Sequence, residues 1–166
     1  MKLVTECLRR NPRVNATWTE KEIIRHGRID MALAVAQEDG LITPVVRNCQ
    51  SKGILAIDEE LTALIDKART GRLQPEDYSN STFTITNLGM FGVEEFSAII
   101  NPPNSAILAI GAAIKEQVFD AAGAASLQTR VRLTMSCDHR IVDGAIGAAF
   151  LRDLKALIEY PIDGWY

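Results

Sequence analysis

The apolar residues of this chain follow two different spacings, and each spacing predicts a type of secondary structure. Three segments have apolar residues three and four positions apart, which is typical of a helix with one buried face. The first precedes Pro12, the second covers residues 54–71 and the third follows Gly144. The second segment also has acids early, cations late and Gly71 just beyond, all of which favour a helix there.

The remaining apolar runs are rich in β-branched residues and predict strands. They are VNATW (14–18), RIDMALAVAQ (28–37), LITPVVRN (41–48), STFTIT (81–86), EQVFD (116–120) and TRVRLTMSC (129–137). The turn residues EDG join the second and third runs, so we expect these two to lie side by side. Helices mixed with many strands predict a layered α/β fold around a mixed sheet.

Composition and charge narrow the class of protein. The chain has 166 residues, of which 47% are hydrophobic and 23% charged, as in one soluble globular domain. Its net charge of −3 argues against broad electrostatic attraction to nucleic acid or anionic membrane. The three cysteines, Cys7, Cys49 and Cys137, have no metal-ligand spacing. We expect them to be free thiols in a reducing compartment.

The stretch SCDHRIVDG, residues 136–144, places a histidine directly after the last predicted strand. Histidine has an unperturbed pKa near neutrality, so His139 is a candidate base that takes up and returns a proton. The alternative is a histidine hydrogen-bonded in a polar corner. Asp143 stands where it would N-cap the following helix, and Asp138 with Arg140 has the spacing of an ordinary solvated ion pair.

Three blocks of the sequence resemble the catalytic domain of the dihydrolipoamide acyltransferases, the core components of 2-oxoacid dehydrogenase complexes. The family signature, Asp-His-Arg, two variable residues and then Asp-Gly, is met in full by residues 138–144. Residues 81–112 resemble the central block of the family, most closely that of the pyruvate dehydrogenase acetyltransferase, and residues 28–48 resemble an earlier strand pair. The resemblance implies a fold like that of chloramphenicol acetyltransferase, a mixed sheet with packed helices, assembled as trimers.

The resemblance also implies a reaction and roles for three residues. The family moves an acyl group between the thiols of dihydrolipoamide and coenzyme A. A thiol with a pKa of roughly 8.5 is mostly protonated at neutral pH, so the reaction needs a base, which by resemblance is His139. The family uses a hydroxyl, usually of serine, to stabilise the oxyanion, and Thr86 holds that position here. Asp143 takes the ionic, orienting position, whose arginine partner lies near the start of the family's domain.

By the same resemblance, residues 1–166 are one acyltransferase catalytic domain that is incomplete at its N-terminal end. Coenzyme A is the expected substrate, the lipoyl group is carried on a separate upstream domain, and no metal is expected. The expected partners are the homotrimer and its larger core, lipoyl domains, and the 2-oxoacid dehydrogenase and dihydrolipoamide dehydrogenase components, with no nucleic acid and no membrane. The expected location is the bacterial cytoplasm or the mitochondrial matrix.

Two other functions stay open, a non-catalytic scaffold subunit of such a complex and a free-standing acetyltransferase of the same fold. Retention of His139 and Thr86 argues against the first, and the central block argues against the second. Among weaker candidates, NLGMFG (87–92) lacks the lysine of a phosphate-binding loop and is expected to be a turn. Cys137 is expected in the core, and His26 at the surface.

Overall fold

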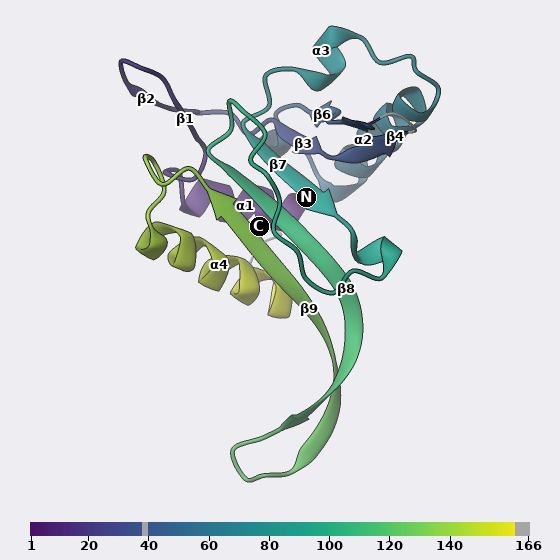
Figure 1. Cartoon of the computed structure of the whole chain (residues 1–166), viewed down its shortest axis with the longest axis vertical. Coiled ribbons are helices and arrows are strands. Elements are labelled where there is room, and N and C mark those ends of the chain that lie inside the picture. The colour runs from purple at the N-terminus through teal and green to yellow at the C-terminus, as the bar shows by residue number, and fades with distance from the viewer. Residues whose placement is uncertain (38–39, 162–166) are drawn as a thin grey trace.

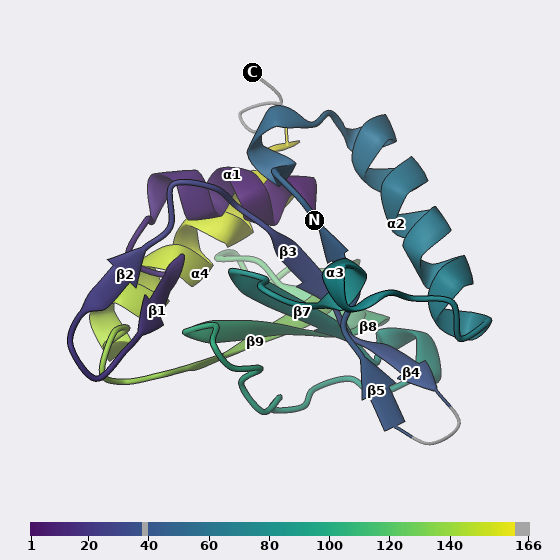
Figure 2. The same cartoon turned by 90° about the horizontal axis from the view of Figure 1, so that it is seen from above.

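A five-stranded mixed sheet forms the centre of this computed structural model, which describes residues 1–37 and 40–161 (Figure 1). Three helices, α1 (Lys2–Arg10), α2 (Ile54–Arg69) and α4 (Gly144–Glu159), lie on one face of the sheet (Figure 2). The predicted α/β architecture is therefore confirmed. Among the described residues, no helix has the length and apolar character to cross a membrane.

The three predicted helices bury the apolar faces that their sequences show. In α4, the buried side chains are Phe150, Leu154 and Leu157, which recur at helical spacing. The helix α2 has its cations in the last turn and is followed by Gly71 in a left-handed conformation, as the sequence indicates. The single-turn helix α3 (Pro75–Tyr78) is absent from the prediction, because one turn has no apolar periodicity.

The main sheet combines parallel and antiparallel pairs. Its strands, in spatial order, are β6 (Val45–Val46), β3 (Met31–Leu33), β7 (Phe83–Asn87), β8 (Ala106–Phe119) and β9 (Ala125–Cys137). The strands β3, β7 and β8 run parallel, while β6 and β9 are antiparallel to their neighbours. The carboxyl end of β9 therefore lies beside the amino end of β8.

Two small antiparallel pairs accompany the main sheet, β1 (Ala16–Trp18) with β2 (Ile23–Arg25) and β4 (Val35–Gln37) with β5 (Gly40–Ile42). The predicted runs 28–37 and 41–48 lie side by side as expected, but each splits into two strands, so that β3 pairs with β6 and β4 with β5. The first two residues of the EDG turn lie outside the described residues.

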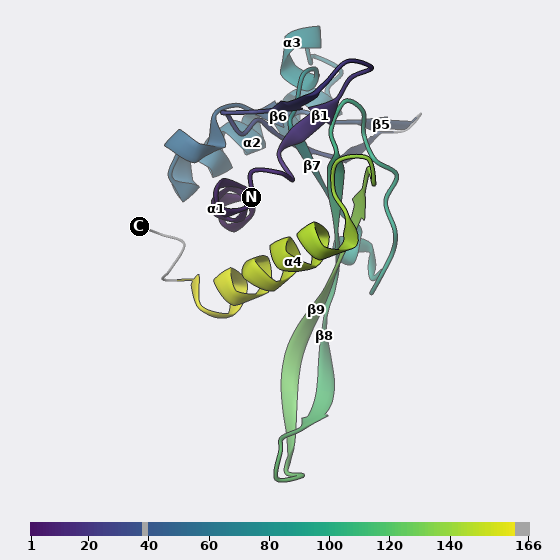
Figure 3. The same cartoon turned by 90° about the vertical axis from the view of Figure 1, so that its left-hand side faces the viewer.

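The hairpin of β8 and β9 projects well beyond the body of the molecule (Figure 3). The run EQVFD is not a separate strand but the distal part of β8, which continues through an irregularity between Ile110 and Ala113. Gly111 at this point gives room to a loop, because a Cβ on Gly111 would clash with the backbone oxygen of Glu94.

The hydrophobic core between sheet and helices fixes both ends of the segment that carries His139. The rings of Phe83 on β7 and Phe150 on α4 are fully buried, with their centroids 5.9 Å apart. The thiol of Cys7 on α1 donates a hydrogen bond to the Phe150 carbonyl oxygen at 3.2 Å. Because α4 is anchored to the sheet and to α1, the turn between β9 and α4 is held at both ends.

Candidate active site

His139 lies in the tight turn between β9 and α4, where it is exposed. The backbone N–H groups of Ile141 and Val142 each donate to the Asp138 carbonyl oxygen at 3.0 Å. The Asp138 N–H donates to the carbonyl oxygen of Ser105 at 2.8 Å, and the Val142 side chain is 1% exposed. The turn is therefore rigid, while the imidazole that it carries faces solvent and has no hydrogen-bond partner among the described residues. In the part of the chain that the structure describes, His139 is not a histidine bonded in a polar corner.

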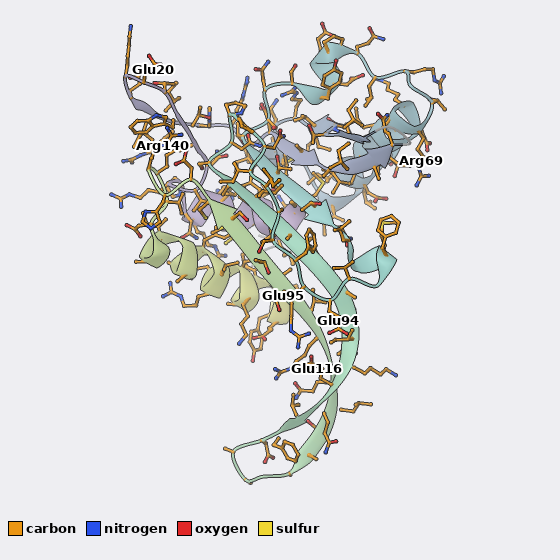
Figure 4. All side chains as sticks on the ribbon, viewed as in Figure 1. Glu20, Arg69, Glu94, Glu95, Glu116 and Arg140 are labelled. Atoms are coloured by element: carbon orange, nitrogen blue, oxygen red, sulfur yellow. The ribbon has the colours of Figure 1, made fainter. Side chains whose placement is uncertain are left out.

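The neighbours of His139 in the motif pair with each other, as the sequence indicates. The Arg140 guanidinium donates to both carboxylate oxygens of Asp138, with Nη2–Oδ2 at 2.6 Å. This hydrogen bonding holds the pKa of Asp138 below its usual range and raises that of Arg140. The guanidinium also lies over the indole ring of Trp18, with its Cζ 4.8 Å from the ring centroid. Figure 4 shows Arg140 at the end of the molecule that carries β1 and β2.

Asp143 is the N-cap of α4. Its Oδ1 accepts a hydrogen bond from the Ile146 N–H at 2.9 Å, and its backbone is extended as a cap requires. The capping prediction is confirmed. The carboxylate is exposed, and no ion pair involves it among the described residues.

Thr86 lies near the carboxyl end of β7, half-buried, and its hydroxyl has no hydrogen-bond partner in the described part of the chain. Thr86 is opposite Ala109 of β8, which is opposite Thr134 of β9. Three further residues of β9 and two strand spacings separate Thr86 from Cys137, so their Cα atoms are about 14 Å apart. His139 lies beyond that strand end. One chain therefore does not bring His139 and Thr86 together.

The weaker candidates behave mostly as expected. Cys137 packs against the core, and the three cysteines are free. The NLGMFG segment contains the 3₁₀ turn η2 (Gly89–Phe91). His26 was expected at the surface and is half-buried. Its Nε2 lies 2.8 Å from the Thr17 hydroxyl oxygen, and burial lowers its pKa. Within residues 1–37 and 40–161, no three His, Cys, Asp or Glu side chains are grouped so that they could hold a metal ion.

Sequence reasoning missed two residues that support the His139 turn. They are Ser105, whose carbonyl oxygen accepts from the turn, and Trp18, whose ring lies under Arg140. Both are distant from residue 139 in the sequence. An aromatic residue in a short strand carries no signal of such a contact, so only the fold reveals them.

Comparison with known proteins places this arrangement of sheet, helices and motif in one class. A solved chloramphenicol acetyltransferase shares the fold, with a TM-score of 0.55 at 14% identity over 99% of this chain and 75% of that one. Residues 1–164 match the family described as 2-oxoacid dehydrogenases acyltransferase (catalytic domain). The chain belongs to this family.

Individual relatives agree with this assignment. The acetyltransferase component of the Rickettsia conorii pyruvate dehydrogenase complex is 43% identical over 159 residues, which are 96% of this chain and 38% of that protein. The mitochondrial component of Dictyostelium discoideum is also 43% identical, over 98% of this chain and 26% of that protein. The chain thus spans well under half the length of these relatives.

Two solved structures are also similar. A probable dihydrolipoamide acetyltransferase from Listeria monocytogenes has a TM-score of 0.91 and 36% identity, over 96% of this chain and 68% of that one. The Azotobacter vinelandii dihydrolipoamide acetyltransferase has a TM-score of 0.88 and 32% identity, over 93% of this chain and 65% of that one. The latter was studied for the role of a serine, a histidine and an asparagine in its catalytic mechanism.

Proposed function

We propose that this chain is the catalytic part of an enzyme that transfers an acetyl group between dihydrolipoamide and coenzyme A in the core of a pyruvate dehydrogenase complex. The observation that carries the proposal is the state of His139. It is an exposed imidazole without a hydrogen-bond partner among the described residues, on a turn that is fixed at both ends. A general base needs both properties, because it must be accessible and positioned.

The spacing of the studied residues in the Azotobacter enzyme supports the same roles. Its histidine and asparagine stand four positions apart, as do His139 and Asp143, and its serine precedes the histidine by 52 positions. Thr86 precedes His139 by 53 positions in this chain. A threonine in place of serine keeps the hydroxyl and adds a methyl group that restricts χ1.

His139 and Thr86 take the acid–base and oxyanion roles in a balanced acyl transfer. His139 takes the proton of the coenzyme A thiol, and the thiolate attacks the carbonyl carbon of acetyl-dihydrolipoamide. The negative charge on the tetrahedral intermediate's oxygen accepts a hydrogen bond from the Thr86 hydroxyl. The C–S bond to the dihydrolipoyl group then breaks, and its sulfur takes the proton back from His139. The reverse reaction uses the same groups in the opposite order.

Because His139 and Thr86 are far apart within one chain, the proposed site requires residues from two subunits. Thr86 is about 14 Å from Cys137 at the end of β9, and His139 lies beyond that end, so the proposed reaction needs the histidine of one subunit beside the threonine of another. A cyclic homotrimer provides three equivalent interfaces, each with one residue from each side. The proposed site is thus shared between subunits.

The same proposal includes the remaining parts of the enzyme. This chain covers 68% of the Listeria chain. An upstream domain carries the lipoyl group, and the dehydrogenase and dihydrolipoamide dehydrogenase components are the partners of a larger core in bacterial cytoplasm or mitochondrial matrix.

Mixing two inactive variants tests the proposal. His139→Ala and Thr86→Ala are made in the full-length polypeptide, unfolded together, refolded and assayed for release of coenzyme A from acetyl-coenzyme A with dihydrolipoamide. A site is intact only when the histidine comes from a Thr86→Ala chain and the threonine from a His139→Ala chain. With free assortment about a quarter of the sites recover.

Refolded wild-type protein gives the activity of fully intact sites, and each variant refolded alone gives the background activity. Mixed activity no higher than the mean of the two variants excludes the shared site. His139→Ala with more than half the wild-type rate excludes His139 as the base, since a positioned base contributes about 10²–10⁴ in rate. Wild-type protein that assembles without any acetyl transfer identifies a scaffold subunit instead.

A further inference from the structure

Trp18 contacts the turn that carries His139 from a distant part of the chain. It ends strand β1, directly opposite Ile23 of β2, and its ring is 38% exposed. The Arg140 guanidinium lies over this ring, with Cζ 4.8 Å from the centroid. A guanidinium within about 6 Å of an aromatic face is attracted by the negative charge of the π-system.

Hydrogen bonds hold the chain on both sides of Trp18. The β1–β2 turn is closed by a hydrogen bond from the Thr19 N–H to the Glu22 carbonyl oxygen at 3.0 Å, and the Thr19 hydroxyl bonds the Glu22 backbone at both N–H and oxygen. The preceding residue, Thr17, is 9% exposed and lies 2.8 Å from the His26 ring. Both residues that flank Trp18 are therefore held in place.

Arg140 connects this support to the backbone of the turn. Its Nε and Nη2 donate to the Asp138 carboxylate, and the same carboxylate accepts the Arg140 backbone N–H at 3.0 Å. Asp138 in turn bonds Ser105 through its own N–H. His139 is the residue between the two members of this pair. The two members of this pair therefore border His139 on both sides.

We propose that Trp18 is a positioning residue, which holds the Asp138–Arg140 pair and thereby sets the orientation of the His139 imidazole. This inference rests on the proposed function of His139. The stacked ring restricts Arg140 to the geometry in which both carboxylate oxygens are bonded. Without the ring the exposed pair exchanges among other rotamers, and the base spends less time in the reactive position. Such misplacement lowers kcat, because it affects the transition state more than substrate binding.

Substitutions in the full-length polypeptide test this role. Trp18→Leu keeps an apolar side chain but removes the π-face, and it is expected to lower kcat about tenfold with KM within twofold, a change that corresponds to about 1.4 kcal/mol. Trp18→Phe keeps a π-face and is expected to restore most of kcat. Ile23→Ala, on the opposite strand, is the matched control for the hairpin and is expected to keep kcat within twofold.

A double-variant cycle shows whether Trp18 acts through Arg140. Arg140→Met alone is expected to lower kcat at least as much as Trp18→Leu, and adding Trp18→Leu to it is expected to change kcat by less than twofold. Melting temperature and assembly mass are measured for each variant.

Several outcomes overturn the inference. It is wrong if Trp18→Leu keeps kcat, if Trp18→Phe is as slow as Trp18→Leu, if Ile23→Ala is equally slow, or if the two losses multiply in the double variant. If His139→Ala is slow in the same assay, these outcomes leave the proposed function intact. A fast His139→Ala enzyme overturns both.

Discussion

Asp143 offers the sharpest test of how the active-site turn contributes to stability. Its Oδ1 accepts the Ile146 N–H at 2.9 Å, which satisfies one of the donors left free at the start of α4. Removing an aspartate N-cap costs about 0.5–2 kcal/mol, whereas asparagine caps nearly as well. The negative charge near the helix N-terminus adds about 0.3–1 kcal/mol, which asparagine loses.

We therefore expect Asp143→Ala to lower the free energy of unfolding by about 1–3 kcal/mol and Asp143→Asn by about 0.3–1 kcal/mol. The loss is global rather than local, because α4 buries Phe150, Leu154 and Leu157 in the core. In a chain of this size, a loss of 1 kcal/mol lowers the melting temperature by about 2–4 °C.

Urea unfolding and thermal melting of the 166-residue chain measure both variants. Lys155→Ala, at an exposed position on the same helix, is the control and is expected to change stability by less than about 0.5 kcal/mol. Equal stability of Asp143→Ala and Asp143→Asn would refute the reasoning, because only the asparagine retains a capping oxygen.

Three further results are expected. Thr86→Ala lowers kcat by up to about 10²–10³ with little change in KM, while Thr86→Ser is nearly neutral, and a serine variant as slow as alanine contradicts the role of the hydroxyl. Gly111→Ala lowers the free energy of unfolding by about 1–3 kcal/mol, and with it the urea midpoint, because the new Cβ meets backbone atoms. Gly27→Ala leaves the midpoint unchanged, because the space around Gly27 is open. Burial lowers the pKa of His26 in the folded chain, whereas in the unfolded chain histidine has its usual pKa of about 6.5. Below that pH the unfolded chain binds more protons than the folded chain, so stability falls as the pH drops from 7 towards 5. His26→Gln flattens this part of the curve in urea unfolding, and an unchanged slope contradicts the argument.

Local patterns predicted the helices and most strand positions. Helix α2 is bounded as its periodicity, late cations and Gly71 indicate, because each of these signals acts within one turn. The strand runs were found by their β-branched residues, but their lengths were not. The run EQVFD was expected as a strand of its own, whereas pairing with β9 joins it to the preceding residues of β8. Pairing energy comes from the partner strand, which a local window does not contain.

The site follows the same division. The motif of residues 138–144 identified the base candidate. It also identified the ion pair and the helix cap, because both contacts join residues within a few positions of one another. The Thr17–His26 contact and the stacking of Arg140 on Trp18 join separate segments, and the sequence did not indicate either.

By itself, the sequence determined the family, the three long helices, most strand positions, and the identity of His139, Thr86 and Asp143 as candidates. Only the tertiary structure decided that His139 is exposed on a rigid turn and that Thr86 lies two strands away from the end of β9. The physical reason is that backbone periodicity and capping are short-range properties of the chain. Distance between two strands depends on sheet order and register, which form only when the core of the whole domain packs.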